Sequence, residues 1–357
     1  MKSNLKRLRY FLKDSNKKSY YVIFKELLQL WAIKKHFPYH YIGRYFYRKD
    51  APTNFKDYLS VQEYNRLMES IASRNLKHPT ISSIIVDKLF FYFYCLEHKI
   101  STPKVISYNF KKSFFFNGQT FTIKSSSELV DYFLMVFKSA NISSIFLKPT
   151  QGRQGFGIIL LNEVTILEQS SQVLEALINN PYIHQEVVIQ HNEVSMIHHK
   201  SINTIRLETF IDKEDIIHFL GAYMRFGSGD SVVDNISSGG FFVPINIEES
   251  KLFKKALTGM IKGARITDKH PDSGFVFEDF KIPYFDEVLT LVRNVASLFP
   301  GYIQGWDIAI TENGPIIIET NDFPGLLQGE FSYHGYKNKP IFKEIMEDTK
   351  EYHKTKR

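Results

Sequence analysis

The chain has 357 residues, of which 43% are hydrophobic and 23% charged, so its composition excludes a wholly disordered chain and a collagen-like repeat. A single cysteine, Cys95, allows no internal disulfide, and no charged-then-apolar leader opens the sequence, so we expect a cytoplasmic protein. The formal net charge is +7, but residues 1–50 hold 13 Lys and Arg against 3 Asp and Glu, which leaves the rest of the chain nearly neutral.

The basic N-terminal segment, residues 1–60, is expected to be largely helical. Residues 19–35 alternate apolar clusters with charged residues, which is typical of an amphipathic helix that packs its apolar side into a core. The basic charge leaves two interpretations open: a solvated helical face, or a peripheral contact with the inner face of a membrane. No nucleic-acid-reading motif accompanies the charge, so we expect no nucleic-acid partner.

Residues 61–144 are expected to form a first lobe that opens with helices. Short strands are then predicted at 145–149 and 156–161, on either side of the Gly-rich sequence QGRQG. A helix is predicted over 167–179, because apolar residues cluster there before Asn-Asn-Pro ends it. These elements predict a small α+β lobe over residues 145–190.

Three strand-like runs predict a second sheet: 204–212, 217–227 and 240–247. A hairpin is predicted further on, from 305–310 to 315–321, because Asn313-Gly314 between them is a strong turn signal. These elements predict a second, central lobe over residues 191–345. Residues 346–357 are expected to be a polar tail, with residues 350–357 frayed.

Three oxygen-bearing side chains of this hairpin, Asp307, Glu319 and Asn321, are predicted to share one face. Glu319 and Asn321 are two residues apart, and side chains at that spacing in a strand point to the same side. Hard oxygen ligands of this kind suit Mg²⁺, with Mn²⁺ as an alternative. Ordinary polar alternation on a solvated sheet would give the same pattern. The apolar opposite face expected for the alternating isoleucines, Ile318 among them, and the lack of basic partners favour the metal site.

A second candidate site consists of Lys148 followed by Gly152, Gly155 and Gly157. Glycines let a backbone approach a phosphate closely and offer its N–H groups, while a nearby lysine supplies a cation. A Gly-rich hairpin turn is the alternative interpretation, because the order of residues is not that of a P-loop.

Together these motifs resemble the ATP-grasp superfamily over roughly residues 80–330, specifically its sugar-transfer-associated branch, with kinship to ribosomal-protein glutamate ligase and D-alanine–D-alanine ligase. The resemblance is carried by VDKLFFYFYCLEHKISTPK, IFLKPTQGRQGFGI, YIHQEVVIQHNE, SINTIRLETF, GAYMRFGSGDSVVDNISSGG and GWDIAITENGPIIIETNDFPG. It implies an α+β ATP-grasp fold that holds a nucleotide between two sheet-containing lobes, here with an N-terminal helical extension. It also assigns the metal ligands to Asp307, Glu319 and Asn321.

The resemblance implies further residues around the phosphates of ATP. Lys88 and Lys148 match the two lysines that contact phosphates. Arg206 matches an arginine directed at the reacting phosphate. Arg225 and Asn235 match a pair that flanks the acyl-phosphate in the ligases, and we list these three as candidate catalytic residues.

The hinge strand implied by the resemblance binds adenine and ribose. Gln185 and Glu186 would face the amino group of the base, the backbone at Val187 and Val188 would meet the ring, and Glu193 would reach the ribose.

The implied activity is that of an ATP-dependent carboxylate–amine (or carboxylate–thiol) ligase that forms an acyl-phosphate and releases ADP and phosphate. The implied partners are a small-molecule or sugar-acid substrate and an amine acceptor, in cell-surface polysaccharide biosynthesis. Two alternatives stay open: an ATP-dependent phosphotransferase, and a nucleotide-binding scaffold for a membrane-bound glycosyltransferase complex.

Overall fold

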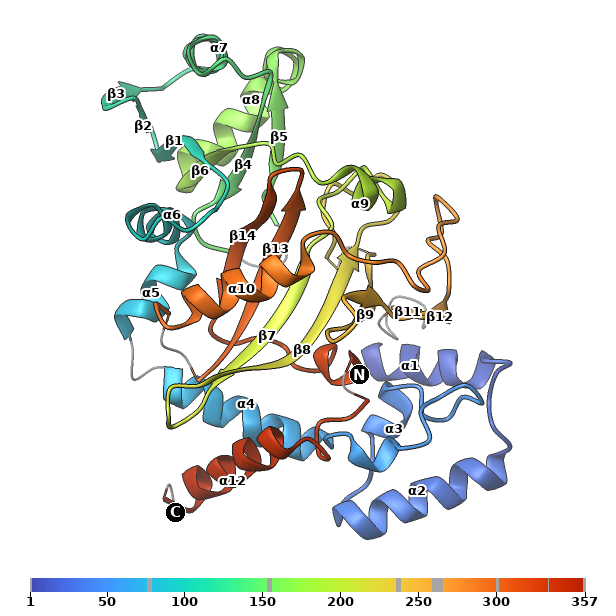
Figure 1. Ribbon diagram of the computed structural model, residues 1–357. Helices are drawn as coiled ribbons and strands as arrows, with labels where there is room; N and C mark the ends of the chain where they lie inside the picture. Colours follow the sequence, from blue (N-terminus) through green and yellow to red (C-terminus); the bar gives the residue numbers. More distant parts are fainter. Residues whose placement is uncertain are drawn as a thin grey trace.

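The structure, a computed structural model, describes residues 2–75, 79–152, 156–235, 239–258, 266–299, 302–332 and 334–355, with side chains from residue 8 onward. Within these residues the strands form two antiparallel sheets, one of six strands and one of eight (Figure 1). The smaller sheet lies above the larger one in this view, and the N-terminal helices lie below. The expected α+β class, with two sheet-containing lobes and an N-terminal helical extension, is confirmed.

The smaller sheet has the strand order β3-β2-β1-β6-β4-β5. Its strands are β1 (Val105–Phe110), β2 (Ser113–Phe116), β3 (Gln119–Thr122), β4 (Ser144–Pro149), β5 (Ile159–Asn162) and β6 (Tyr182–Glu186). Two helices, α7 (Ser126–Ala140) and α8 (Glu163–Asn179), pack their apolar sides on it, where Phe133 and Leu177 are fully buried. Each helix begins with a capping box, which satisfies the free N–H groups of its first turn.

The smaller sheet extends across the boundary expected at residues 144 and 145. Strands β4 and β5 and helix α8 lie where strands and a helix are predicted, but β1, β2, β3 and α7 come from the preceding segment and complete the same sheet. The turn between β2 and β3 is Asn117-Gly118, with φ of 48° and 74°. Asn-Gly between two short runs is a hairpin signal that could have revealed these strands.

The larger sheet has the order β12-β11-β9-β8-β7-β13-β14, and β10 pairs with β9. Its strands are β7 (Ile205–Ile211), β8 (Ile217–Phe226), β9 (Phe241–Asn246), β10 (Lys251–Leu252), β11 (Ala256–Leu257), β12 (Ile266–Thr267), β13 (Ile303–Thr311) and β14 (Gly314–Asn321). The three predicted strands and the predicted hairpin are therefore confirmed. The turn needs glycine at 314, where φ is +103°.

Four helices pack on the main core cluster of the larger sheet: α5 (Pro79–Val86), α6 (Lys88–Glu97), α9 (Asn192–Ile197) and α10 (Phe285–Ala296). A separate cluster joins the sheet to α4 (Val61–Asn75) and α12 (Pro340–Thr355). The expected frayed end is wrong within the described residues, because α12 is helical to Thr355. Phe342 and Ile345 are buried in that cluster, and this packing orders the helix.

The N-terminal segment contains α1 (Lys2–Lys13), α2 (Tyr20–Lys34), α3 (His40–Gly43) and the 3₁₀ turn η1 (Phe55–Asp57), and a short helix α11 (Gly329–Ser332) of the body meets it. Arg44 forms a buried ion pair with Glu330, which ties the segment to the body. The apolar face expected to pack into a core is mostly exposed in α2. Among its apolar side chains only Ile23 and Leu30 are buried.

Within the described residues, no single helix has both the length and the apolar composition needed to cross a bilayer. Helices α5 and α6 meet the criteria only as a pair, and they are bent by 108° at their junction.

Candidate active site

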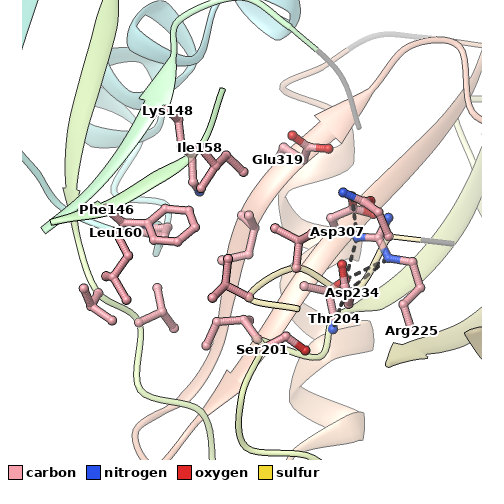
Figure 2. A pocket seen from close by; sticks show the side chains of 18 of the residues that line it. Phe146, Lys148, Ile158, Leu160, Ser201, Thr204, Arg225, Asp234, Asp307 and Glu319 are labelled. Carbon is pink, nitrogen blue, oxygen red and sulfur yellow. Dashed lines mark hydrogen bonds and ion pairs between the residues drawn. The ribbon is translucent and has the colours of Figure 1, made fainter. Parts of the chain in front are cut away.

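A cavity of about 370 Å³ lies between the two sheets and takes side chains from both (Figure 2). Phe146, Lys148 and Leu160 line it from the smaller sheet, and Asp307 and Glu319 line it from the larger sheet. Its volume is in the range of small-molecule binding sites. The residues singled out in the sequence that line it are Lys88, Lys148, Gly152, Glu186, Val187, Val188, Arg225, Asn235, Asp307 and Glu319.

A row of paired positions crosses the larger sheet at the cavity. Glu319 on β14 is the Cα partner of Asp307 on β13. Asp307 is also paired with Arg206 on β7, and Arg206 with Tyr223 on β8. Directly paired residues project to the same face of a sheet, and Arg225 joins that face because it lies two residues beyond Tyr223. The fold therefore brings together two acids and two arginines from four strands.

Asp307 is buried and is held by both arginines. Arg206 donates to it through Nε and through Nη2, the latter at 2.9 Å, and Nη2 of Arg225 lies 2.8 Å from Oδ2. Burial alone would raise the pKa of Asp307, but the two guanidinium groups hold it well below its ordinary value. The expected lack of basic partners is therefore wrong. The arginines lie on strands remote in sequence, so the hairpin alone does not reveal them.

The environment of Glu319 favours its neutral form, whereas that of Asp307 favours the ionised form. Burial, and then the neighbouring carboxylate of Asp307, raise the pKa of Glu319, although Lys88 and Arg206 oppose that rise. Two carboxyl groups side by side disfavour a second negative charge. The hairpin thus holds one firmly ionised carboxylate beside a carboxyl group whose ionisation a cation would favour.

A β-bulge shapes the hairpin at this point. Asp307 pairs with Glu319, but the next residue, Ile308, pairs with Ile317, so Ile318 is left without a partner in the register. Bulges aim side chains differently from regular strands and are frequent beside active sites. Ile318 and Glu319 consequently both line the cavity. The simple apolar opposite face expected for the hairpin is wrong at Ile318 for this reason.

The three oxygen-bearing side chains fit a hard divalent cation. An ionised carboxylate has about four lone-pair sites, and on Asp307 they face three N–H donors of Arg206 and Arg225 and a hydrogen bond with Glu319, so ionisation of Glu319 would free one site for a cation. Among the described residues, Nδ2 of Asn321 is buried and has no hydrogen-bond partner; this donor would gain from an anion such as a phosphate, and only Oδ1 of Asn321 could ligate a cation. Asn321 lies two residues beyond Glu319 on β14, on the same side of the strand. Two carboxylates and one amide oxygen are a ligand set suited to Mg²⁺ or Mn²⁺.

Both expected phosphate lysines lie at this cavity. Lys88 opens α6, and its Nζ donates to the carbonyl of Gly152 at 3.0 Å. Lys148 lies on β4 with its Nζ 5.0 Å from the centre of the Phe146 ring. Burial, reinforced by the positive charge of Lys88, lowers the pKa of Lys148 to about 8, against the attraction of Glu319. An anion bound beside this buried ammonium group would stabilise its charged form.

The glycines following Lys148 have different positions. Gly152, with φ of +142°, lines the cavity. Gly157, with φ of +75°, is outside the lining but is tightly enclosed, since a Cβ there would lie 3.0 Å from Pro149 Cγ and from the hydroxyl of Tyr182. Gly155 lies outside the described residues. At both described positions the conformation favours glycine.

The hinge residues divide into two groups. Glu186, Val187 and Val188 line the cavity, and Glu186 Oε1 accepts a hydrogen bond from the backbone N–H of Lys104 at 2.9 Å. Gln185 does not line it, because its side chain is buried and donates to the carbonyl of Pro103. Glu193 is exposed on α9, and the cavity lining does not include it.

Sequence reasoning missed several of the lining residues. Asp234 accepts hydrogen bonds from the backbone and the hydroxyl of Thr204, at 2.9 and 2.6 Å, and its carboxylate lies 3.4 Å from Nε of Arg225. This network fixes the guanidinium of Arg225, whose pKa is raised by Asp234 and Asp307 even though burial opposes it.

The apolar lining was missed as well: Phe146, Phe156, Ile158, Leu160, Val232 and Val233. Alternation along β4 and β5 was the available signal for Phe146 and Leu160.

A second hollow, of about 260 Å³, adjoins the first. The two share Lys88, Gly152, Arg225, Asn235 and Glu319 in their linings. The remaining sequence-predicted residues of the larger sheet, Arg206 and Asn321, line this second hollow. The charged row of the sheet therefore lies at the border of two adjoining spaces.

The model of one protein family, described as sugar-transfer associated ATP-grasp, matches residues 71–334. No curated protein matches the chain. Among solved structures, similarity is found to the ATP-grasp ligase PsnB complexed with a minimal precursor, at 14% identity and a TM-score of 0.41, covering 76% of this chain and 62% of that one.

Two further solved structures are similar. Carboxyaminoimidazole ribonucleotide synthase from Aspergillus clavatus, complexed with ATP, has 12% identity and a TM-score of 0.41, covering 67% of this chain and 45% of that one. D-alanyl-alanine synthetase A from Vibrio cholerae has 12% identity and a TM-score of 0.45, covering 76% of this chain and 67% of that one. The chain spans less than two thirds of the length of PsnB and of the Aspergillus enzyme.

Proposed function

The chain belongs to the sugar-transfer-associated ATP-grasp family, and from that premise we propose that it is an ATP-dependent ligase that joins a carboxylate to an amine or a thiol. The observation that carries the proposal is the division of the cavity into two sides (Figure 2). Phe146 and Leu160 give it an apolar side, and Asp307, Asp234 and Arg225 give it a charged side. A nucleotide has the same division between an aromatic base and charged phosphates.

The adenine belongs on the apolar side. Phe146 and Leu160 offer contact to the faces of the ring, and the backbone of Val187 and Val188 offers hydrogen-bonding groups beside it. Glu186 also lines the cavity, although the backbone N–H of Lys104 already donates to one of its carboxylate oxygens. An apolar enclosure with a few polar groups is the usual design of such a site.

The phosphates belong beside Lys88 and Lys148, whose ammonium groups offset their charge. When bound, Mg²⁺ (or Mn²⁺) held by Asp307, Glu319 and Asn321 would supply further charge neutralisation at the phosphates. Arg225 and Asn235 line both hollows, which supports a role for them in binding the transferred phosphoryl group. Arg206 supports them by holding Asp307 in position. Phosphoryl transfer depends mainly on such positioning and charge stabilisation.

The proposed reaction has two steps. A carboxylate oxygen of the acid attacks the γ-phosphorus of ATP, the bond from that phosphorus to the β,γ-bridging oxygen breaks, and ADP leaves. The amine nitrogen, or thiol sulfur, then attacks the acyl carbon, the carbon–oxygen bond to phosphate breaks, phosphate leaves, and the proton of the nucleophile passes to solvent. A sugar acid or other small acid and an amine acceptor, in cell-surface polysaccharide synthesis, are the substrates we propose.

The proposal is tested by product analysis with the purified full chain. ATP and magnesium are incubated with a matrix of sugar acids and amino acids, and nucleotides and conjugates are separated and identified by mass spectrometry. We expect ADP, phosphate and an amide only in wells that contain both a matching acid and a matching amine. AMP and pyrophosphate as products would reject the proposal.

The same assay distinguishes the two alternatives. A stable phosphorylated product that forms without any amine would indicate a phosphotransferase. Equal and negligible ATP turnover by the native chain and by Asp307→Ala, across the whole matrix, would indicate a nucleotide-binding scaffold.

A further inference from the structure

Helix α2 presents a row of large apolar side chains to solvent. Tyr21, Phe24, Leu28 and Trp31 are 76%, 61%, 44% and 52% exposed. They recur at spacings of three, four and three residues, so they lie along one side of the helix. Isolated exposed apolar residues are ordinary on protein surfaces, whereas a continuous row marks an interaction site.

The opposite side of α2 already supplies the contacts that hold the helix to the protein. Ile23 and Leu30 are buried in the aromatic cluster of the N-terminal segment. Lys34 is buried beside them, and its Nζ donates to the carbonyl of Tyr58 and to Glu63 at 2.8 and 2.9 Å. The exposed row is therefore a second apolar face, separate from the one that packs.

The apolar surface continues beyond the end of the helix. The rings of Trp31 and Phe37 are 6.5 Å apart between centroids, and those of Phe37 and Tyr39 are 4.9 Å apart. Both Phe37 and Tyr39 are exposed. We refer to this surface as the aromatic stripe: Tyr21, Phe24, Leu28, Trp31, Phe37 and Tyr39.

The charges around the aromatic stripe are predominantly positive. All three acids of residues 1–50 are engaged in ion pairs: Asp14 with Arg48, Glu26 with Lys18, and Asp50 with Lys255. Lys25 follows Phe24, Lys35 comes directly after the last residue of α2, and both are exposed. No carboxylate pairs with either lysine in the part of the chain that the structure describes. The acids are thus neutralised internally while cations remain beside the stripe.

We propose that the aromatic stripe docks on the surface of a bilayer that contains anionic phospholipid, with α2 lying in the plane of the interface. Tryptophan and tyrosine prefer the level of the lipid headgroups, where an apolar ring and a polar atom are both accommodated. Lysines beside such a face attract anionic headgroups while their stems lie along apolar surface. Lys25 and Lys35 beside the aromatic stripe distinguish it from a purely apolar protein interface and favour an anionic bilayer as the partner.

This docking leaves the active site accessible. Helix α2 lies at the lower edge of the protein in Figure 1, beyond the larger sheet, whereas the cavity lies between the two sheets. The proposal is independent of the chemistry proposed above, because no residue of the aromatic stripe lines the cavity.

The two tryptophans of the chain make a direct test possible. Trp31 belongs to the stripe, and Trp306 is fully buried in the core. The full chain is titrated with vesicles of phosphatidylcholine alone and with vesicles that contain about a third phosphatidylglycerol. We expect co-sedimentation with the anionic vesicles, a blue shift of Trp31 emission, and quenching of that emission by brominated lipid. Trp31→Phe keeps binding but loses the spectral change, which assigns the signal.

Two variants test the surface itself. Phe24→Ser combined with Trp31→Ser is expected to weaken vesicle binding about tenfold or more, since each loses buried apolar area at the interface. Val164→Ser combined with Leu167→Ser, at equally exposed positions of α8, is the matched control and is expected to bind normally. Thermal unfolding checks that both variants remain folded.

Three outcomes would overturn the proposal. The first is equal sedimentation with neutral and anionic vesicles. The second is binding without any change in Trp31 emission. The third is a concentration-dependent dimer, detected by light scattering, in which Trp31 is already shielded before lipid is added, because this result would assign the stripe to a second copy of the chain.

Discussion

Asp307 and Glu319 are directly paired across β13 and β14, and their carboxyl groups have opposite charge preferences. Two arginines lower the pKa of Asp307, whereas burial and the charge of Asp307 raise that of Glu319. Removing one carboxylate should therefore differ from removing the other in its effect on stability, even if both are needed for activity.

We expect Asp307→Asn to destabilise the protein by about 3–5 kcal/mol, because it leaves two buried guanidinium groups without their acceptor. Glu319→Gln should leave the free energy of unfolding unchanged or higher, because it removes a charge that the site disfavours. Both should abolish magnesium-dependent ATP turnover. Urea unfolding followed by tryptophan fluorescence measures the difference, and equal destabilisation by the two substitutions would contradict this account of the pair.

The loop after Lys148 offers a matched pair of glycine substitutions. Gly157→Ala places a Cβ 3.0 Å from Pro149 and Tyr182 at a φ of +75°, so we expect the loop to shift and the KM for ATP to rise about tenfold or more. Gly118→Ala has nearly the same φ, +74°, but its Cβ meets open space in a hairpin away from the cavity. That variant should keep the native KM. A parallel rise of the KM in both variants would contradict the assignment of the effect to the loop after Lys148.

Glu208 should make stability depend on pH. It is fully buried, and burial raises the pKa of its carboxyl group from 4.5 to about 8, with Tyr336 and Arg206 opposing. Because the folded pKa lies above the unfolded one, this stabilisation is complete below about pH 4.5 and is lost as pH rises through 8. The free energy of unfolding should fall by about 1.4 kcal/mol per pH unit between these values.

Glu208→Gln should flatten that dependence, since the amide does not titrate. Urea unfolding of the native chain and the variant at pH 5, 6, 7 and 8 makes the comparison. Parallel curves for the two proteins would mean that another group controls the slope.

Two ion pairs join the N-terminal segment to the body, and the buried one, Arg44–Glu330, should stabilise the protein more than the exposed one, Asp50–Lys255. Arg44 and Glu330 are both buried, so Arg44→Met should destabilise by about 3–5 kcal/mol. Lys255 and Asp50 also join the segment to the body, at 3.0 Å, but both are partly exposed, so Lys255→Met should cost about 1 kcal/mol or less. Thermal unfolding of both variants is the measurement. Similar melting temperatures for Arg44→Met and Lys255→Met would show that the Arg44–Glu330 pair does not hold the segment to the body more strongly than the Asp50–Lys255 pair.

Local patterns in the sequence predicted much of the larger sheet and its hairpin. Asn313-Gly314 marks a turn by its own conformational preferences, and Glu319 and Asn321 share a face because strands have a two-residue period. The ion pairs of Asp307 were not predictable in this way. They depend on the register between β13 and β7, and Arg206 lies about a hundred residues before Asp307.

Helix α2 shows another limit of local patterns. Its period predicts a helix with apolar residues, and the helix is present, but Ile23 and Tyr21 lie on different sides of it and both sides carry apolar residues. Only tertiary packing decides that Ile23 is buried and Tyr21 exposed. The bulge at Ile318 was likewise invisible, because it is a property of the pairing between two strands and not of either strand alone.

Titration calorimetry of the purified full chain with a non-hydrolysable ATP analogue, with and without magnesium, tests the central claim most directly. We predict saturable binding of one nucleotide per chain that magnesium tightens, and loss of this tightening in Glu319→Gln, which should remain folded. Absence of any magnesium-dependent nucleotide binding by the native chain would contradict the account.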